Sequence, residues 1–446
     1  MKRTRADIDS KFYKIAIGTI FLSLCAYYMG VASLYWVIVV LVLWLFHCNI
    51  KEVGFFSMLI GSGIFGRIFA SEEVNIIFTV SFLLLGIIVL FKDIIHSLLT
   101  YRHSSFFMFC IILFFLVEYS LGPQNEYASE KMIKLSVRLT IWTILFLIYV
   151  ETDKISNKRI SIAYLILAFY YLSQSAELYG VRPTSFFDTN YFRDYCIQIG
   201  KDENQTHVVN YHTLAYLSLA STVFWTIQRG FNDKKNKLNT VLLLSISFWL
   251  IAISGTRQAI FVHIILMLLR YFLNKKSVFT IKNMFAVTTM IVSFFLIITL
   301  LGSSYFEQTL SSDSDASARL NRDTVTPFIV MAINPEWGVG FGGYSIYGNK
   351  DYPHNFFLEL LCEIGIVGLF LLLLLIFLYI FTNKNKHYVR YLTYNNSYLF
   401  ILFVLFFARA QVSGDLSTSV GFIAILLSFV SHRHRIIIPF IKGNEL

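Results

Sequence analysis

The sequence predicts an all-α, polytopic integral membrane protein that forms one multi-spanning domain over residues 1–446. Three observations predict this class: hydrophobic residues make up 56% of the chain, aromatic residues 17% and charged residues only 14%. A soluble domain carries about 25% charged residues, so this chain has too few charges to cover a surface in water. With only 6 prolines and 44 phenylalanines, the composition also excludes a disordered chain.

Apolar runs in the chain are long enough to cross a bilayer, which requires roughly 17–25 mostly apolar residues per helix. Two of the runs are short and two others are separated only by Gly30, so the expected number of transmembrane helices is about 14, within 12–14. The runs lie at 15–29, 31–47, 53–70, 74–91, 104–121, 132–150, 160–177, 209–227, 239–254, 258–273, 283–301, 356–381, 397–410 and 418–432.

The distribution of charge predicts the orientation of these helices. With the N-terminus in the cytoplasm, the inner segments hold 25 of the 37 basic residues and 8 of the 27 acidic residues, a net charge of 25 − 8 = +17. The rest of the chain then carries 12 − 19 = −7. Because cytoplasmic loops are enriched in Lys and Arg, we expect both termini in the cytoplasm. The total of +10 thus reflects membrane orientation, and no nucleic acid partner is expected.

Two long segments fall on the outer side, at 178–208 and 302–355, and both are expected to be periplasmic loops. Loops of this length are usually functional or disordered. The second contains N-cap residues followed by a predicted helix over 316–333, which ends at Asn334-Pro335. This helix carries Arg319 and Arg322, three residues apart and therefore on one face.

A glycine-rich turn, GVGFGG at 338–343, follows the predicted loop helix. The missing side chains at Gly340 and Gly342 would let backbone N–H groups approach a ligand, although a plain reverse loop is an equally good interpretation. No Cys, His, Asp or Asn cluster has the spacing of a metal site, and the five cysteines are scattered, so we expect neither metal nor cofactor.

Ionisable residues gather toward the outer ends of the predicted helices, where their common depth suggests a shared cavity. Such residues are functional candidates by default, although each alone could snorkel or form a structural pair. They are Arg67, Glu118, Arg138, Glu177, Arg257, Glu359, Glu363 and Arg409.

One histidine stands out because of its neighbours. His354 lies at the outer mouth of the run at 356–381, and Glu359 and Glu363, four residues apart, share a helix face below it. An imidazole is suited to removing or delivering a proton, although a histidine at a helix start more often caps the helix.

Three motifs in the segment 254–368 resemble the O-antigen ligase and O-antigen polymerase superfamily. The stretch PHNFFLE at 353–359, followed by EIGIVG at 363–368, is similar to the family's H-N-x-x-L-x-x-x-x-E-x-G-x-x-G signature. NPEWGVG at 334–340 resembles its N-P-x-x-G-x-G segment, and SGTRQA at 254–259 resembles its S-G-S/T-R-x-A helix-end motif. Arg319 matches the family's loop arginine, with Arg322 as an available substitute.

The resemblance implies a glycosyltransferase in the bacterial inner membrane, with its active site on the periplasmic side. It would move a glycan from an undecaprenyl-diphosphate carrier, with inversion and without a metal. Guanidinium groups bind phosphate oxygens bidentately, so Arg257 and Arg319 are expected to stabilise the leaving diphosphate. His354 is the expected base for the acceptor hydroxyl. The expected substrate-binding residues are Arg322, Asn355, Glu359, Glu363, Gly340, Gly342, Arg67 and Arg409.

Two acceptors remain open. A polymerase would extend another lipid-linked repeat unit, whereas a ligase would modify the lipid A core; the number of helices and the two outer loops favour the polymerase. Expected partners are the lipid-linked oligosaccharide donor and acceptor, membrane lipids, a chain-length regulator and a flippase. A non-enzyme alternative is a lipid-linked saccharide flippase, but the chain has neither an internal repeat nor polar residues along a whole transmembrane path.

Overall fold

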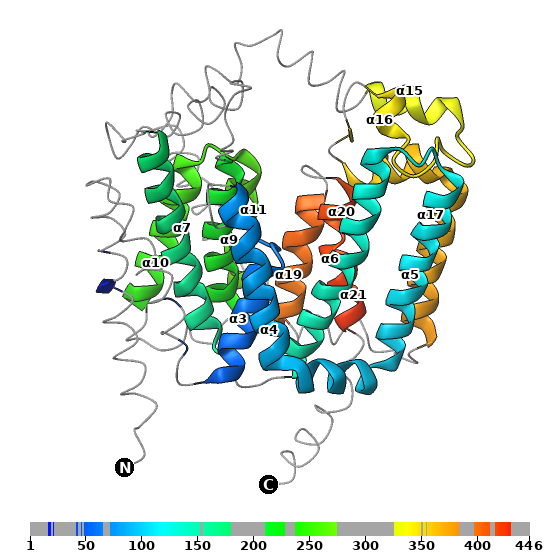
Figure 1. Ribbon diagram of the computed structural model, residues 1–446. Coiled ribbons are helices and arrows are strands. Elements are labelled where there is room, and N and C mark those ends of the chain that lie inside the picture. The colour runs from blue at the N-terminus through cyan, green and yellow to red at the C-terminus, as the bar shows by residue number, and fades with distance from the viewer. Residues whose placement is uncertain are drawn as a thin grey trace, which may run out of the picture. The chain divides into compact units, whose positions relative to one another are not determined.

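The computed structural model describes residues 17–18, 21, 42, 46, 49–65, 72–151, 155–179, 210–227, 237–273, 325–348, 351–353, 355–382, 397–410 and 415–429. Across these ranges the regular structure is helical and there is no strand, which confirms the predicted all-α class (Figure 1). The predicted runs at 15–29 and 31–47 lie almost entirely outside the described residues, and the run at 283–301 lies wholly outside them.

The chain divides into two compact units that are built from interleaved segments. Unit 1 comprises residues 1–90 and 154–309, and unit 2 comprises residues 91–153 and 310–446. Helix α4 (Glu72–Thr100) contributes its first part to unit 1 and its last part to unit 2. The other described helices of unit 1 are α3 (Ile50–Gly61), α7 (Asn157–Tyr179), α9 (Tyr211–Ile227), α10 (Lys237–Ile253) and α11 (Arg257–Leu273).

Helix α9 forms the centre of unit 1. All of its side chains from Thr213 to Ile227 are buried, as expected for a helix that is apolar on every face. It packs against α7, α10 and α11. The ring of Phe224 on α9 stacks on Tyr164 of α7, with 5.9 Å between the ring centroids and 2° between the planes.

Unit 2 contains the buried polar residues of the candidate site. A buried hydroxyl pair joins three of its helices: Tyr379 donates a hydrogen bond to the carbonyl oxygen of Leu427 (2.5 Å), and Ser104 donates to the same oxygen (2.8 Å). Its helices besides the end of α4 are α5 (Arg102–Leu121), α6 (Glu126–Glu151), α15 (Thr326–Ile333), α16 (Tyr344–Tyr347), α17 (Phe356–Thr382), α19 (Ser397–Ala410), α20 (Leu416–Ser419) and α21 (Gly421–Phe429).

Four helices in the described residues are long and apolar enough to cross a membrane. They are Asn75–Thr100, Arg102–Leu121, Glu126–Val150 and Phe356–Thr382. Shorter apolar helices follow the predicted runs elsewhere, at Val241–Ile253, Gln258–Leu268, Ile401–Ala410 and Leu416–Ser428.

Helix α17 shows why these helices suit a bilayer. Its exposed side chains are almost all large and apolar: Phe370 is 63% exposed, Phe377 54% and Phe381 71%. A water-soluble protein rarely leaves so continuous an apolar face uncovered, whereas lipid tails are as apolar as these side chains. The protein is therefore a multi-pass membrane protein.

One boundary differs from the sequence prediction, and a second is described only at its end. Helix α6 begins at Glu126, six residues before the predicted apolar run, because its first turn is polar and hydropathy alone does not detect it. Of the predicted helix over 316–333, the structure describes α15, which begins at Thr326 and ends before Asn334 as predicted. Residues 316–324, with Arg319 and Arg322, lie outside the described part of the chain.

Candidate functional site

Helix α17 is interrupted within its first three turns. Gly365 has φ 64° and ψ −171°, a conformation that is essentially restricted to glycine. Because of the kink, two backbone N–H groups form hydrogen bonds outside the helix. Ile366 N–H donates to the carbonyl of Pro335, and Val367 N–H donates to the carbonyl of Glu336, both at 3.0 Å.

The glycine-rich turn occupies this kink. Val339 N–H donates to the carbonyl of Cys362 (2.8 Å), and Gly340 N–H donates to the carbonyl of Glu363 (2.9 Å). The sequence suggested that such N–H groups would be offered to a ligand, but the Gly340 N–H is bonded within the protein. The turn is thus a structural part of α17, held to it by two backbone hydrogen bonds, and two more join α17 to Pro335 and Glu336 just before the turn.

The first residue of the turn must be a glycine because it lies very close to the backbone of α17. Gly338 has φ 72°, and a Cβ atom at this position would clash with the backbone of Glu363. Gly342 also has a positive φ, of 75°, and a Cβ atom there would meet Ala128 of α6. The turn therefore sits tightly between α17 and α6.

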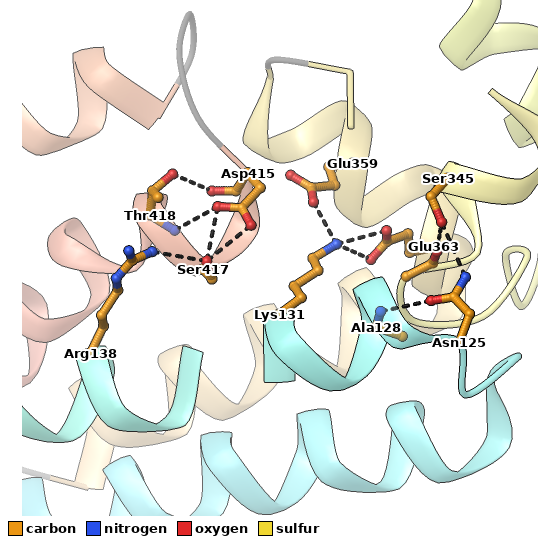
Figure 2. Close-up of polar contacts among 11 residues, drawn as sticks. Asn125, Ala128, Lys131, Arg138, Ser345, Glu359, Glu363, Asp415, Ser417 and Thr418 are labelled. Carbon is orange, nitrogen blue, oxygen red and sulfur yellow. Dashed lines mark hydrogen bonds and ion pairs between the residues drawn. The ribbon is translucent and has the colours of Figure 1, made fainter. Parts of the chain in front are cut away.

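A buried ion cluster lies beside the turn (Figure 2). Lys131 Nζ of α6 donates to both carboxylate oxygens of Glu363, at 2.7 and 2.6 Å, and lies 2.5 Å from Glu359 Oε1. The exposed fractions of these three side chains are 0% or 1%. The aromatic ring of Phe341, from the turn, lies 4.9 Å from the ammonium group, within the range of a cation–π contact.

This cluster contains more carboxyl groups than amino groups. One ammonium faces two carboxylates: it donates two hydrogen bonds to Glu363 and forms an ion pair with Glu359. Among the described residues, no group donates a hydrogen bond to Glu359 Oε2. A buried carboxylate without a full set of partners costs free energy, so Lys131 is the group on which the folded state of this cluster depends.

A second polar group lies next to the first, as Figure 2 shows. Asp415 caps α20 by accepting the N–H of Thr418 at 3.0 Å. The Ser417 hydroxyl lies 2.9 and 3.0 Å from the two oxygens of the same carboxylate. Arg138 Nη1 donates to Ser417 Oγ at 3.0 Å. Because Arg138 follows Lys131 by seven residues, the two cations lie two turns apart on one face of α6.

The start of α6 is tied to the other side of the turn. Asn125 Oδ1 accepts the backbone N–H of Ala128 at 2.7 Å, which satisfies a free donor in the first turn of the helix. Its amide nitrogen donates to the hydroxyl of Ser345 on α16 at 3.1 Å. Helices α6, α16 and α17 and the glycine-rich turn therefore form one connected polar assembly (Figure 2).

The structure places several of the predicted site residues. Glu359 and Glu363 share one face, as predicted, and meet in the cluster. The side chain of Asn355 caps α17, because its Oδ1 accepts the N–H groups of Phe357 (3.0 Å) and Leu358 (3.1 Å). Arg409 is half-buried in the last turn of α19.

For the remaining predicted residues, either the side chain or the whole residue lies outside the described part of the chain. Arg257 is the first residue of α11, but its side chain is not among the described ones. The other four are His354, Arg319, Arg322 and Arg67. Their roles stay predictions.

Two residues of this assembly, Lys131 and Asp415, were not predicted from the sequence. Lys131 fell one residue before the predicted span at 132–150 and was read as part of a loop. The available signal was the spacing of seven residues between Lys131 and Arg138, which places both on one face of α6. Asp415, followed by Ser417 and Thr418, has the pattern of an N-cap.

The fold and this site define a class of protein: a helical, multi-pass membrane protein with ionised groups buried near one end of its spans. Residues 242–373 match the family model described as O-antigen ligase. The match confirms the resemblance to the O-antigen polymerase and ligase superfamily, and it includes most of α10, all of α11, the glycine-rich turn and the kinked half of α17. No curated protein and no solved structure matches the chain significantly.

Proposed function

We propose that the protein is a repeat-unit polymerase for O-antigen or for a capsular or exopolysaccharide. It would act as a glycosyltransferase that uses an undecaprenyl-diphosphate-linked glycan as donor and the terminal sugar hydroxyl of another lipid-linked repeat unit as acceptor. The family match over residues 242–373 carries this proposal, because it spans all three signature motifs. It supports polymerase-type or ligase-type activity, that is, a glycosyltransferase-like enzyme.

The proposed step is an inverting displacement at the anomeric carbon. The bond from this carbon to the diphosphate oxygen breaks, and the acceptor oxygen bonds from the opposite face. The acceptor proton passes to His354, and undecaprenyl diphosphate leaves with the bonding electron pair. Arg257 and Arg319 would stabilise its growing negative charge, since preorganised cations act strongly where water is sparse.

The position of His354 supports its role as a base. It directly precedes Asn355, the cap of α17, in the sequence, so a helix fixed by its cap, its kink and the ion cluster begins two residues after the proposed base. A general base must be held within hydrogen-bond reach of the proton it removes. We propose that the cap and the cluster provide this rigidity.

The proposal includes the predicted membrane arrangement. Fourteen spans would place both termini in the cytoplasm of a bacterium and the site on the periplasmic side of its inner membrane. The loops at 178–208 and 302–355 would then face the substrates. A chain-length regulator and a flippase are proposed partners, because a polymerase of this kind needs its repeat units delivered outside and its product length set.

A ligase is the second candidate, and the description of the matching family as O-antigen ligase favours it. The surface glycan of a deletion strain separates the two. Loss of a polymerase leaves the lipid A core with one repeat unit, whereas loss of a ligase leaves a bare core and long chains on the lipid carrier. We expect the first outcome; the second would replace the polymerase assignment with ligase.

Complementation of that strain tests the residues. Arg257→Ala, Arg319→Ala and His354→Ala, each at normal membrane levels, should reduce glycan synthesis by about 100-fold or more, the typical effect of removing a catalytic group. Arg257→Lys should also be impaired, because lysine lacks the planar fork. Arg102→Ala, in an exposed arginine at the start of α5, is the matched control and should restore synthesis. Full synthesis by all three alanine variants would remove the basis of the proposed mechanism.

A further inference from the structure

The ion cluster at the kink of α17 contains a residue to which the proposed function gives no role. Lys131 lies outside the segment that matches the family, 242–373, whereas both of its carboxylate partners lie inside it. It is also fully buried by the protein's own residues, so it offers no exposed surface to a substrate. Any effect that it has on the reaction must act through Glu359 and Glu363.

The bonds of Lys131 show which partner it fixes more firmly. Two N–H groups go to the two oxygens of Glu363 at 2.7 and 2.6 Å. A two-point contact of this kind restricts the orientation of the carboxylate as well as its position. The backbone N–H of Gly342 also interacts with this carboxylate, so Glu363 joins α6 to the glycine-rich turn through its side chain.

The backbone of Glu363 makes a second connection to the same turn. Its carbonyl accepts the N–H of Gly340 at 2.9 Å, and the kink at Gly365 follows two residues later. A displaced Glu363 would therefore move the turn and the kink together. Lys131 controls this displacement, because without it two carboxylates four residues apart would repel each other in a water-poor interior.

Through Glu359, Lys131 also contacts α17 closer to the start of the helix. Glu359 lies one turn before Glu363, and its Oε1 is 2.5 Å from Lys131 Nζ. Asn355 caps the helix one turn earlier still, and His354 is the residue before this cap. The ammonium group of Lys131 thus fixes the first two turns of α17, and His354 directly precedes the cap of this helix in the sequence.

We propose that Lys131 is a positioning residue for glycan transfer: by clamping Glu363 and Glu359, it holds the start of α17 and the glycine-rich turn in the reactive arrangement. This inference rests on the proposed function. It predicts that loss of Lys131 slows the chemical step more than it weakens substrate binding, since a small misplacement of a catalytic group lowers the rate without removing the binding contacts.

The test uses full-length protein in membranes of the deletion strain, with the lipid-linked repeat unit isolated from that strain as substrate. For Lys131→Met we expect kcat to fall by about 100-fold with KM changed by less than about threefold. Lys131→Arg, which keeps a cation with forked donors, should retain most of the activity. Lys134→Met is the matched control: Lys134 lies nearly one turn further along α6, is 46% exposed and pairs with Glu130, and its loss should leave kcat within about twofold.

If Lys131→Met does not accumulate, an exchange of charges between Lys131 and Glu363 tests the proposal instead. Lys131→Glu alone would place three carboxylates together and should abolish activity. Lys131→Glu combined with Glu363→Lys restores one cation and two carboxylates, and should recover at least about tenfold in kcat over the single variant. Recovery of this size supports the proposal.

Three results would overturn the positioning role: wild-type kcat in Lys131→Met, an exchanged variant that accumulates normally but recovers no activity, or one that accumulates no better than Lys131→Glu. Failure of the proposed function has a different signature, because wild-type membranes themselves would then not lengthen the lipid-linked unit.

Discussion

Gly365 is the single residue on which the geometry of the site most directly depends. Its left-handed backbone releases the N–H groups of Ile366 and Val367, which bond to the segment before the glycine-rich turn. A side chain at this position would be strained in conformation and would also clash with the backbone of Glu336. Gly63 provides a comparison, because it also has a positive φ, of 61°, but has open space around it.

We predict that Gly365→Ala destabilises the protein more than Gly63→Ala does. Conformational strain alone costs about 1–2 kcal/mol, which is the expectation for Gly63→Ala. The clash adds to this value at Gly365, and the displaced turn should also lower glycan transfer. Thermal unfolding of the two detergent-solubilised variants, alongside their transfer activity, measures both effects. Equal unfolding midpoints and equal activity would show that the kink tolerates a side chain.

Residue spacing predicted part of the site and could not predict the rest. The separation of Glu359 and Glu363 by four residues placed both on one helix face, because the helical period is local information. Lys131 is 232 residues from Glu363, and no local pattern reports a contact of that kind. The glycine-rich turn was recognised, but its bonds to α17 depend on the kink, which the sequence did not reveal.

At the scale of elements, helix α17 is fixed at its start by Asn355, which the sequence predicted as a substrate-binding residue. Its Oδ1 accepts two backbone N–H groups, so a cap function is built into the structure. The two roles require different atoms: capping uses the amide oxygen, whereas donation to a sugar hydroxyl would use the amide nitrogen. A substitution that keeps only the oxygen therefore separates them.

We predict that Asn355→Ala lowers stability by about 1 kcal/mol, the usual effect of losing an N-cap, and lowers glycan transfer as well. Asn355→Asp retains the acceptor and should restore both. Asn49→Ala is the control, because Asn49 caps α3 by accepting the N–H of Lys51; it should lose similar stability without the loss of transfer. If Asn355→Asp is stable but inactive, the amide nitrogen binds substrate directly.

The order of the helices was more predictable than their packing. The apolar runs at 104–121, 160–177, 356–381 and 397–410 coincide closely with α5, α7, α17 and α19, because hydropathy is recorded along the chain. The sequence did not indicate that residues 91–153 join residues 310–446 in one compact unit while the segment between them forms most of another. That division depends on which apolar faces match, which composition does not specify.

At the scale of the whole molecule, the net charge of +10 is explained by how the charged residues are distributed along the chain. A soluble chain of this charge would suggest an acidic macromolecular partner. Here the apolar, outward-facing helices imply a bilayer, and charge then orients the chain. The predicted division into +17 inside and −7 elsewhere leaves few basic residues on the outer side. Lys131 and Arg138 belong to this small set, and both have carboxylate or hydroxyl partners.

The orientation gives the last prediction, which uses a reporter enzyme that is active only outside the cytoplasm. Fusions after residues 201 and 350 should be active, and fusions after residues 235 and 384 should be inactive. Each pair is separated by one described helix, α9 for 201 and 235 and α17 for 350 and 384, so the members of a pair must differ if that helix crosses the membrane. Activity after residue 235 with none after 201 would reverse the orientation and place the ion cluster on the cytoplasmic side. Equal activity within a pair would show instead that the intervening helix does not span, because basic loops remain inside only where a spanning segment separates them from the outer loops.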